Sequence, residues 1–88
     1  MPDDLDDYSG VPRYIQVARV IEGEIRSGKW EVGSPVSSRS QLAQRFGVAV
    51  ETAARAHRWL ATAGYLATVP GVGMVVLPQD RWPAATGE

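Results

Sequence analysis

Arginine and hydroxyl side chains gather in the middle of this 88-residue chain. Between residues 37 and 58 the sequence holds four arginines against one acid, a local charge of +3, together with Ser38, Ser40 and Thr52. These charged residues are Arg39, Arg45, Arg55, Arg58 and Glu51. Arginine and hydroxyl groups commonly contact phosphate, so the window is typical of a surface that binds a nucleic-acid backbone. The alternative is an ordinary solvated surface, because arginine is common on proteins of every kind.

The chain offers little to catalysis or to metal binding. It has one histidine, His57, and no cysteine. Nucleophilic triads and zinc sites draw on several such side chains, so we expect a binding module and not an enzyme, with no cofactor and no metal. We expect His57 to be a partly buried, hydrogen-bonded side chain, the alternative being a pH sensor.

The net charge of −1 is distributed unevenly along the chain. Four of the ten acids lie in the first seven residues, whereas residues 8–88 hold nine bases against six acids, or +3. We expect residues 1–11 to form a flexible acidic arm, either a solvated tail or a competitor of DNA for the basic window. No apolar run approaches membrane-spanning length, no signal peptide opens the chain, and cysteine is absent, which fits a cytoplasmic protein.

Helical periodicity and helix-end signals predict three helices. Apolar residues at i, i+3 and i+4 spacing favour a helix over about 12–27, which Gly28 ends. Ser38 and Gln41 match a capping box that begins a second helix, and Gly47 permits a tight turn after it. A third helix is expected over 49–63, with Ala53, Ala56, His57 and Leu60 facing inward. The pair of helices is typical of a helix-turn-helix.

Two short strands are predicted after the third helix. Residues 65–69 alternate in a strand-like way, residues 70–73 form a turn, and residues 74–77 are rich in β-branched side chains. A further short strand is expected around Val36. The resulting fold class is mainly α with a small β-hairpin, a winged helix-turn-helix over residues 12–77, followed by a loose tail over 78–88.

The spacing of many positions resembles the DNA-binding domain of the GntR family of bacterial transcription regulators. The matching positions are Tyr14, Ile15, Ser27, Gly28, Gly33, Val36, Ser38, Leu42, Ala43, Gly47, Val48, Thr52, Ala56, Leu60, Gly64, Tyr65, Leu66, Gly71 and Gly73. The resemblance implies a regulator that binds double-stranded DNA, as a homodimer or with another regulatory protein. Members usually carry a further effector-binding domain, which we do not expect here because the sequence stops soon after the wing.

The chain departs from the family at positions expected to face DNA. Where the family usually has three arginines that contact DNA, this chain has Ser40, Val50 and Ala54. Ala49 stands where a helix-capping side chain is usual, a loss on the order of 1 kcal/mol. We expect the remaining contacts to come from Arg39, Arg55, Arg58 and Thr52, with Val50 meeting a thymine methyl. The predicted DNA-binding residues are Ser38, Arg39, Ser40, Val50, Glu51, Thr52, Arg55, Arg58 and Gly71.

Two tryptophans suggest an alternative function. Trp59 stands on the third helix at a usually polar site, and Trp82 lies in the tail. Either ring belongs to a protein interface or packs back on the domain. With the missing arginines, an interface would indicate a winged helix that has lost most sequence-specific DNA binding and now binds proteins.

Overall fold

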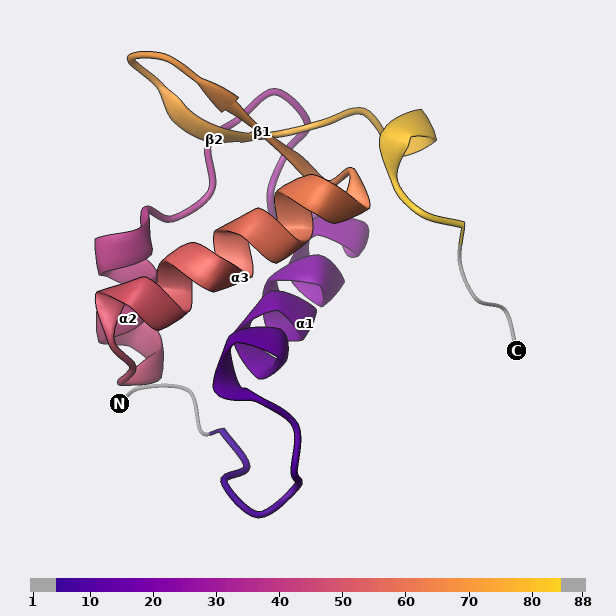
Figure 1. Ribbon diagram of the computed structural model, residues 1–88. Helices are drawn as coiled ribbons and strands as arrows, with labels where there is room; N and C mark the ends of the chain where they lie inside the picture. Colours follow the sequence, from indigo (N-terminus) through magenta and orange to yellow (C-terminus); the bar gives the residue numbers. More distant parts are fainter. Residues whose placement is uncertain (1–4, 85–88) are drawn as a thin grey trace.

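The computed structural model describes residues 5–84 and contains three helices followed by a β-hairpin (Figure 1). The elements are α1 (Arg13–Arg26), α2 (Arg39–Phe46), α3 (Val50–Ala63), β1 (Leu66–Val69), β2 (Gly73–Val76) and a short 3-10 turn (Gln79–Arg81). This order and shape confirm the predicted winged helix-turn-helix. Each predicted helix is present, with ends that differ by one residue at most.

Helix α1 begins one residue later than predicted because Pro12 has an extended backbone, with φ −54° and ψ 145°. The helix ends before Ser27, and Gly28 then takes a positive φ of 90°. Its buried face consists of Val17, Ala18, Ile21 and Ile25. These residues recur every three or four positions, as the sequence periodicity predicts.

Helices α2 and α3 form the helix-turn-helix. The capping box of α2 is present, since the Ser38 hydroxyl accepts from the Gln41 amide and the Gln41 side chain accepts from the Ser38 amide. Gly47 ends α2 in the left-handed conformation, φ 69°, which glycine adopts without steric cost. Helix α3 starts after Ala49 without any side-chain cap, so the predicted loss of that cap is confirmed.

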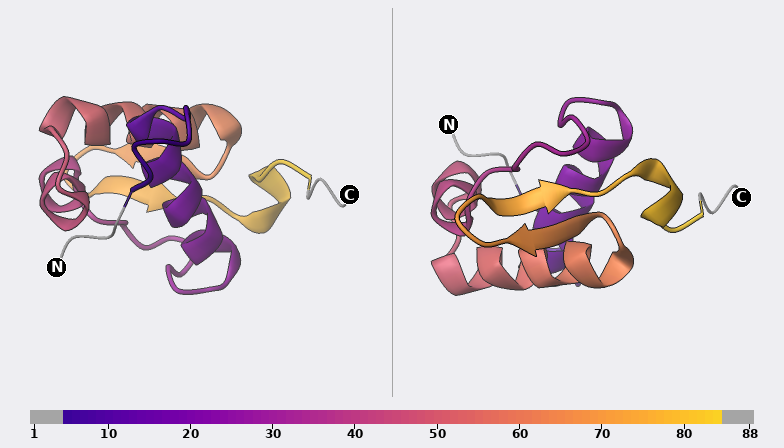
Figure 2. Two further views of the ribbon diagram at one scale, coloured as in Figure 1. Left: turned by 90° about the horizontal axis from the view of Figure 1, so that it is seen from below. Right: turned by 90° about the horizontal axis from the view of Figure 1, so that it is seen from above.

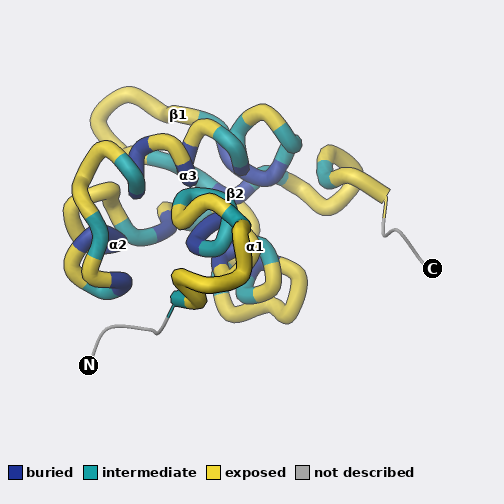
Figure 3. The backbone as a smooth tube through the Cα atoms, turned by 60° about the horizontal axis from the view of Figure 1, so that its bottom comes forward, coloured by how far each residue is buried: buried dark blue, intermediate teal, exposed yellow. Residues whose placement is uncertain are grey.

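The core lies where α1, α2 and α3 meet the start of the hairpin. Ile21, Leu42, Leu60 and Tyr65 are fully buried there, and burial of each of the three aliphatic side chains contributes roughly 1.5–3 kcal/mol. Figure 3 shows the buried positions gathered at this junction, while the hairpin tip and the segment before α1 are exposed.

The hairpin, which we call the wing, pairs Leu66 with Val76 and Val69 with Gly73 in antiparallel register. The segment before α2 runs along the free edge of β2, where the Val36 amide donates to the Met74 carbonyl at 2.9 Å. Pro35 forms an isolated antiparallel β-bridge with Val75. This single bridge stands where a short strand was expected around Val36. These bonds attach the wing to the residues that lead into α2, on the side seen from above in Figure 2.

Side chains at both ends of the described chain pack on the core, Leu5 before α1 and Trp82 after β2. We expected a flexible arm over residues 1–11, yet Leu5 packs on the core and the Gln16 side chain bonds the Asp6 and Val11 backbone. Trp82, for which packing on the domain was one of two alternatives, packs on the core. The packed part of the chain therefore extends on both sides of residues 12–77, while residues 1–4 and 85–88 lie outside the described residues.

Candidate nucleic-acid interface

The wing tip (residues 70–72) and the first turns of α2 and α3 lie on one side of the molecule, at the left of Figure 1. A hollow lies between the wing and the start of α2 on this side. It is lined by Pro35, Val36, Ser38, Arg39, Gln41, His57, Thr68, Val72, Gly73 and Met74. Ser38, Arg39 and Ser40 are all exposed here, so the side chains predicted to contact phosphate at the start of α2 are accessible.

His57 lies at the base of this hollow and is 8% exposed. Its Nε2 is 3.0 Å from the Ser37 carbonyl oxygen, which can only accept, so Nε2 carries the proton and donates. Burial lowers the pKa of His57 below its usual 6.5, and the nearby Arg39 charge lowers it further, while the bond to Ser37 opposes both. The sequence favoured a partly buried, hydrogen-bonded histidine, and His57 is hydrogen-bonded and 8% exposed.

The exposed edge of α3 carries Val50, Glu51 and Arg58. Val50 is 45% exposed at the first position of the helix. Arg58 donates to Glu51 Oε2 at 3.1 Å, in an ion pair whose two side chains are 63% and 74% exposed. Such a pair contributes little to stability, so its charges can exchange for other partners.

Ala54 differs from what the sequence implied. It occupies a position where an arginine would face DNA, yet it is buried, with 6% of its surface exposed. Ala54 therefore offers no contact to a ligand on this face.

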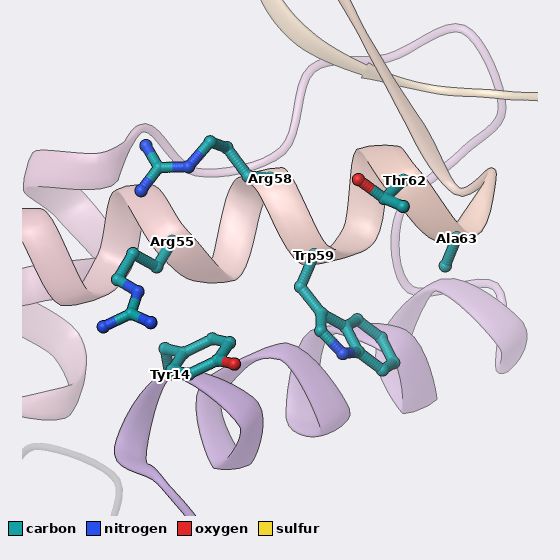
Figure 4. Close-up of a pocket in the computed structure, with 6 residues that line it drawn as sticks. All are labelled: Tyr14, Arg55, Arg58, Trp59, Thr62 and Ala63. Atoms are coloured by element: carbon teal, nitrogen blue, oxygen red, sulfur yellow. The ribbon is translucent and has the colours of Figure 1, made fainter.

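Thr52 and Arg55 lie on another edge of α3, beside α1. The Arg55 guanidinium carbon is 4.4 Å from the centre of the Tyr14 ring (Figure 4). Thr52 is half-buried and shares a hollow with Pro12, Arg13, Tyr14 and Arg55. Arg55 also lines a second hollow with Arg58 and Tyr14, so it lies between Thr52, which is beside α1, and Arg58.

Arg45 cannot be counted with the basic residues of this face. Its guanidinium binds the Glu24 carboxylate of α1, with Nη1 3.1 Å from Oε1. Burial alone would raise the pKa of Glu24, but hydrogen bonds from Arg45, Trp30 and Lys29 outweigh it and lower the pKa to about 2. The charge of +3 counted for residues 37–58 therefore overstates the positive charge that this face presents to a ligand, because Arg45 is paired with Glu24.

The wing tip is apolar and uncharged. No charged residue occurs between residues 66 and 79. Val69 and Val72 are 38% and 55% exposed, and Gly71 turns the chain with a φ of 79°. The wing can therefore offer backbone amides and apolar side chains to a ligand, and no ionic contact.

Neither tryptophan is exposed. Trp59 is half-buried and packs on the core between α3 and α1, where it lines a hollow with Tyr14 and Arg58 (Figure 4). The Trp82 ring lies 5.7 Å from the Tyr65 ring and donates its Nε1 proton to the Leu77 carbonyl at 2.8 Å. A protein interface at either ring stays a prediction, and the packing alternative accounts for both positions.

Two negative findings concern residues 5–84. Within them no three acidic or histidine side chains approach closely enough to hold a metal ion. None of the helices in this part of the chain is both long enough and apolar enough to cross a membrane.

The three helices, the hairpin and the shared face of α2, α3 and the wing define a winged helix-turn-helix domain. The family model of the gntR family of bacterial regulatory proteins matches residues 13–76. The chain belongs to this family. No curated protein matches its sequence.

Solved structures of regulators have the same fold. AraR(DBD) in complex with operator ORX1 is 29% identical, with a TM-score of 0.78, and the match covers 85% of this chain and 95% of that one. A GntR family transcriptional regulator from Listeria monocytogenes is 31% identical, with a TM-score of 0.77, over 88% of this chain and 66% of that one. YtrA from Sulfolobus acidocaldarius, a GntR-family transcription factor, is 28% identical with a TM-score of 0.76, over 85% and 64%. The match thus spans about two thirds of the latter two proteins.

Proposed function

We propose that this domain binds double-stranded DNA and regulates transcription. The observation that carries the proposal is the convergence of the first turns of α2 and α3 with the wing tip on one accessible face. In a helix-turn-helix the second helix enters the major groove through its N-terminal residues. Similar domains support this use of the face, since AraR(DBD) is described with an operator and S. agalactiae BusR with its promoter DNA.

The side chains on this face suit different parts of the DNA. Ser38, Arg39 and Ser40 are placed to contact phosphates beside the major groove. Arg58 supplies a second cation on this face, since the guanidinium N–H groups that do not bind Glu51 can donate to a phosphate. Gly71 lets the wing backbone approach the neighbouring groove.

Thr52 and Arg55 form the flank of the proposed interface. They face the beginning of α1, where Arg13 also lines the hollow. The Arg55 guanidinium is stacked on Tyr14 and remains exposed, so a phosphate strand that passes α1 can meet it. The proposal therefore assigns these two residues to the DNA backbone and not to base edges.

Titration of labelled duplexes at several salt concentrations tests the proposal. Affinity should fall steeply as salt rises, because each phosphate contact releases counterions. Each contact adds about −0.9 to the slope of the logarithm of the binding constant against the logarithm of the salt concentration. Arg39→Ala should weaken binding and reduce that slope by about 1. The matched control is Arg19→Ala, which removes an exposed arginine of α1 outside the proposed interface and should change neither quantity. Absence of binding at the lowest salt, or an equal effect of both variants, would refute the proposal.

A further inference from the structure

The N-terminal end of α3 presents one apolar and one acidic side chain that can face the edge of a base. Val50 and Glu51 occupy the first two helical positions and are both exposed, whereas Ala54, one turn later, is 6% exposed. The exposed arginines further along α3 have partners already, since Arg58 pairs with Glu51 and Arg55 lies over the Tyr14 ring. The side chains of Val50 and Glu51 carry no hydrogen-bond donor of their own.

The chemistry of base edges decides what such a surface recognises. In the major groove guanine presents two acceptors, N7 and O6, and no donor. A carboxylate facing those acceptors is repelled, and a valine cannot satisfy them. Thymine instead presents a methyl group, which suits Val50, and cytosine presents an amino donor, which suits the carboxylate of Glu51.

The ion pair with Arg58 leaves Glu51 able to make this contact. Arg58 donates to Oε2, so Oε1 can accept a hydrogen bond from a base without separation of the pair. The Glu51 side chain is 74% exposed within this pair, so its Oε1 is accessible. Glu51 therefore presents an acceptor one residue after Val50.

We propose that the first turn of α3 reads pyrimidines, a thymine methyl against Val50 and a cytosine amino group against Glu51, in place of arginine–guanine contacts. This inference rests on the proposed DNA binding and adds the base class that the domain selects. It also predicts that binding sites have no required guanine opposite Val50 and Glu51 on the strand that these two side chains face.

The first experiment identifies the site. Duplexes selected from a random pool for binding should share a thymine next to a cytosine. Duplexes with single base substitutions then show which positions of the selected site α3 contacts. Replacement of that thymine by uracil removes only the methyl group and should weaken binding about fourfold, the value of one buried methyl. The same replacement should have a much smaller effect on Val50→Ala, because the shorter side chain loses most of the contact with the methyl group.

Two further variants test the assignment of each side chain. Val50→Arg should change the preferred base opposite residue 50 from thymine to guanine. Glu51→Gln should change the preferred base opposite residue 51 from cytosine to adenine. Val20→Ala, at an exposed valine on α1, is the control and should keep the uracil effect of the parent.

The outcomes separate this inference from the DNA-binding proposal. If no duplex binds at low salt, DNA binding itself is refuted. If duplexes bind with the expected salt dependence but the selected sites require guanine opposite α3, or uracil affects the parent and Val50→Ala equally, the pyrimidine reading alone is overturned. Both substitutions at residue 50 change an exposed side chain, so thermal unfolding should confirm an intact fold in each variant.

Discussion

Arg45 of α2 and Glu24 of α1 form an ion pair at the edge of the core, with Arg45 Nη1 3.1 Å from Glu24 Oε1. The Glu24 side chain is 15% exposed and also accepts from the Trp30 indole and the Lys29 ammonium. Three donors from α2 and the loop after α1 thus meet on one carboxylate. The arrangement ties α2, which presents the proposed phosphate contacts, to α1.

Glu24→Gln should destabilise the domain at neutral pH and make its stability less sensitive to acid. The pKa of Glu24 is lowered from 4.5 to about 2 in the folded state, so the pair stabilises the fold fully above pH 4.5. This stability is lost as pH falls from 4.5 toward 2, because the unfolded chain then binds the proton first. The shift corresponds to an amount on the order of 3 kcal/mol. Urea unfolding at pH 7, 4 and 3 measures it.

Asp7→Asn provides the control for this prediction. Asp7 pairs with Arg13 at 2.8 Å, but both side chains are more than half exposed, so the variant should change stability by less than about 1 kcal/mol. Equal losses in the two variants would show that the Glu24 cluster has no special role.

Local signals in the sequence predicted most of the fold, whereas contacts between distant residues escaped it. The capping box of Ser38 and Gln41 and the helix-ending Gly64 act through near neighbours, so their spacing identifies the ends of helices. The Arg45–Glu24 pair joins residues 21 positions apart, and no periodicity reveals it. Sequence reasoning therefore counted Arg45 among the available cations of the interface.

The same limit applies to the C-terminal segment. Trp82 stands among polar and proline residues that predict a tail, yet its ring packs on Tyr65 and beneath the Arg26 guanidinium. Arg26 also donates to the Pro83 carbonyl at 2.6 Å. The partners of Trp82 come from α1 and from the residue before β1, so only the assembled fold identifies them.

Gly64→Ala should destabilise the domain strongly, by more than about 2 kcal/mol. Gly64 has a φ of 102°, and a Cβ added there would lie 2.2 Å from the Arg81 carbonyl oxygen. The substitution therefore adds backbone strain and displaces the segment that holds Trp82. Thermal unfolding of the variant gives the loss directly.

Gly28→Ala is the matched comparison for Gly64→Ala. Gly28 has a similar φ of 90°, but nothing lies within 4 Å of an added Cβ. Its substitution should cost only the backbone strain, about 1–2 kcal/mol. If the two variants lose the same stability, the close approach of Arg81 has no energetic consequence.

Val72→Lys should strengthen DNA binding and steepen its dependence on salt. Val72 is 55% exposed at the tip of a wing without charged residues, so the wild-type wing adds no ionic contact. A lysine there can reach a phosphate and should steepen the salt slope by about 0.9. Titration of one duplex at several salt concentrations measures both effects.

Val20→Lys controls for the change in net charge, since Val20 is 36% exposed on α1. It should leave the salt slope unchanged. A slope for Val72→Lys that equals the parent's would place the wing tip away from DNA.

His57→Gln should flatten the dependence of stability on pH between about 7 and 5. Burial and the Arg39 charge lower the pKa of His57 in the folded state, so the unfolded chain binds a proton more readily. Stability should therefore fall in the parent as pH drops through 6.5, the pKa of an exposed histidine.

His57 is the only histidine, and the effect of Glu24 begins only near pH 4.5, so the range from pH 7 to 5 isolates the contribution of His57. Arg39→Ala removes one cause of the lowered pKa and should reduce the slope, whereas Arg19→Ala should keep it. Urea unfolding at half-unit steps of pH gives the comparison, and a parent whose stability is constant from pH 7 to 5 would contradict the neutral, buried state of His57.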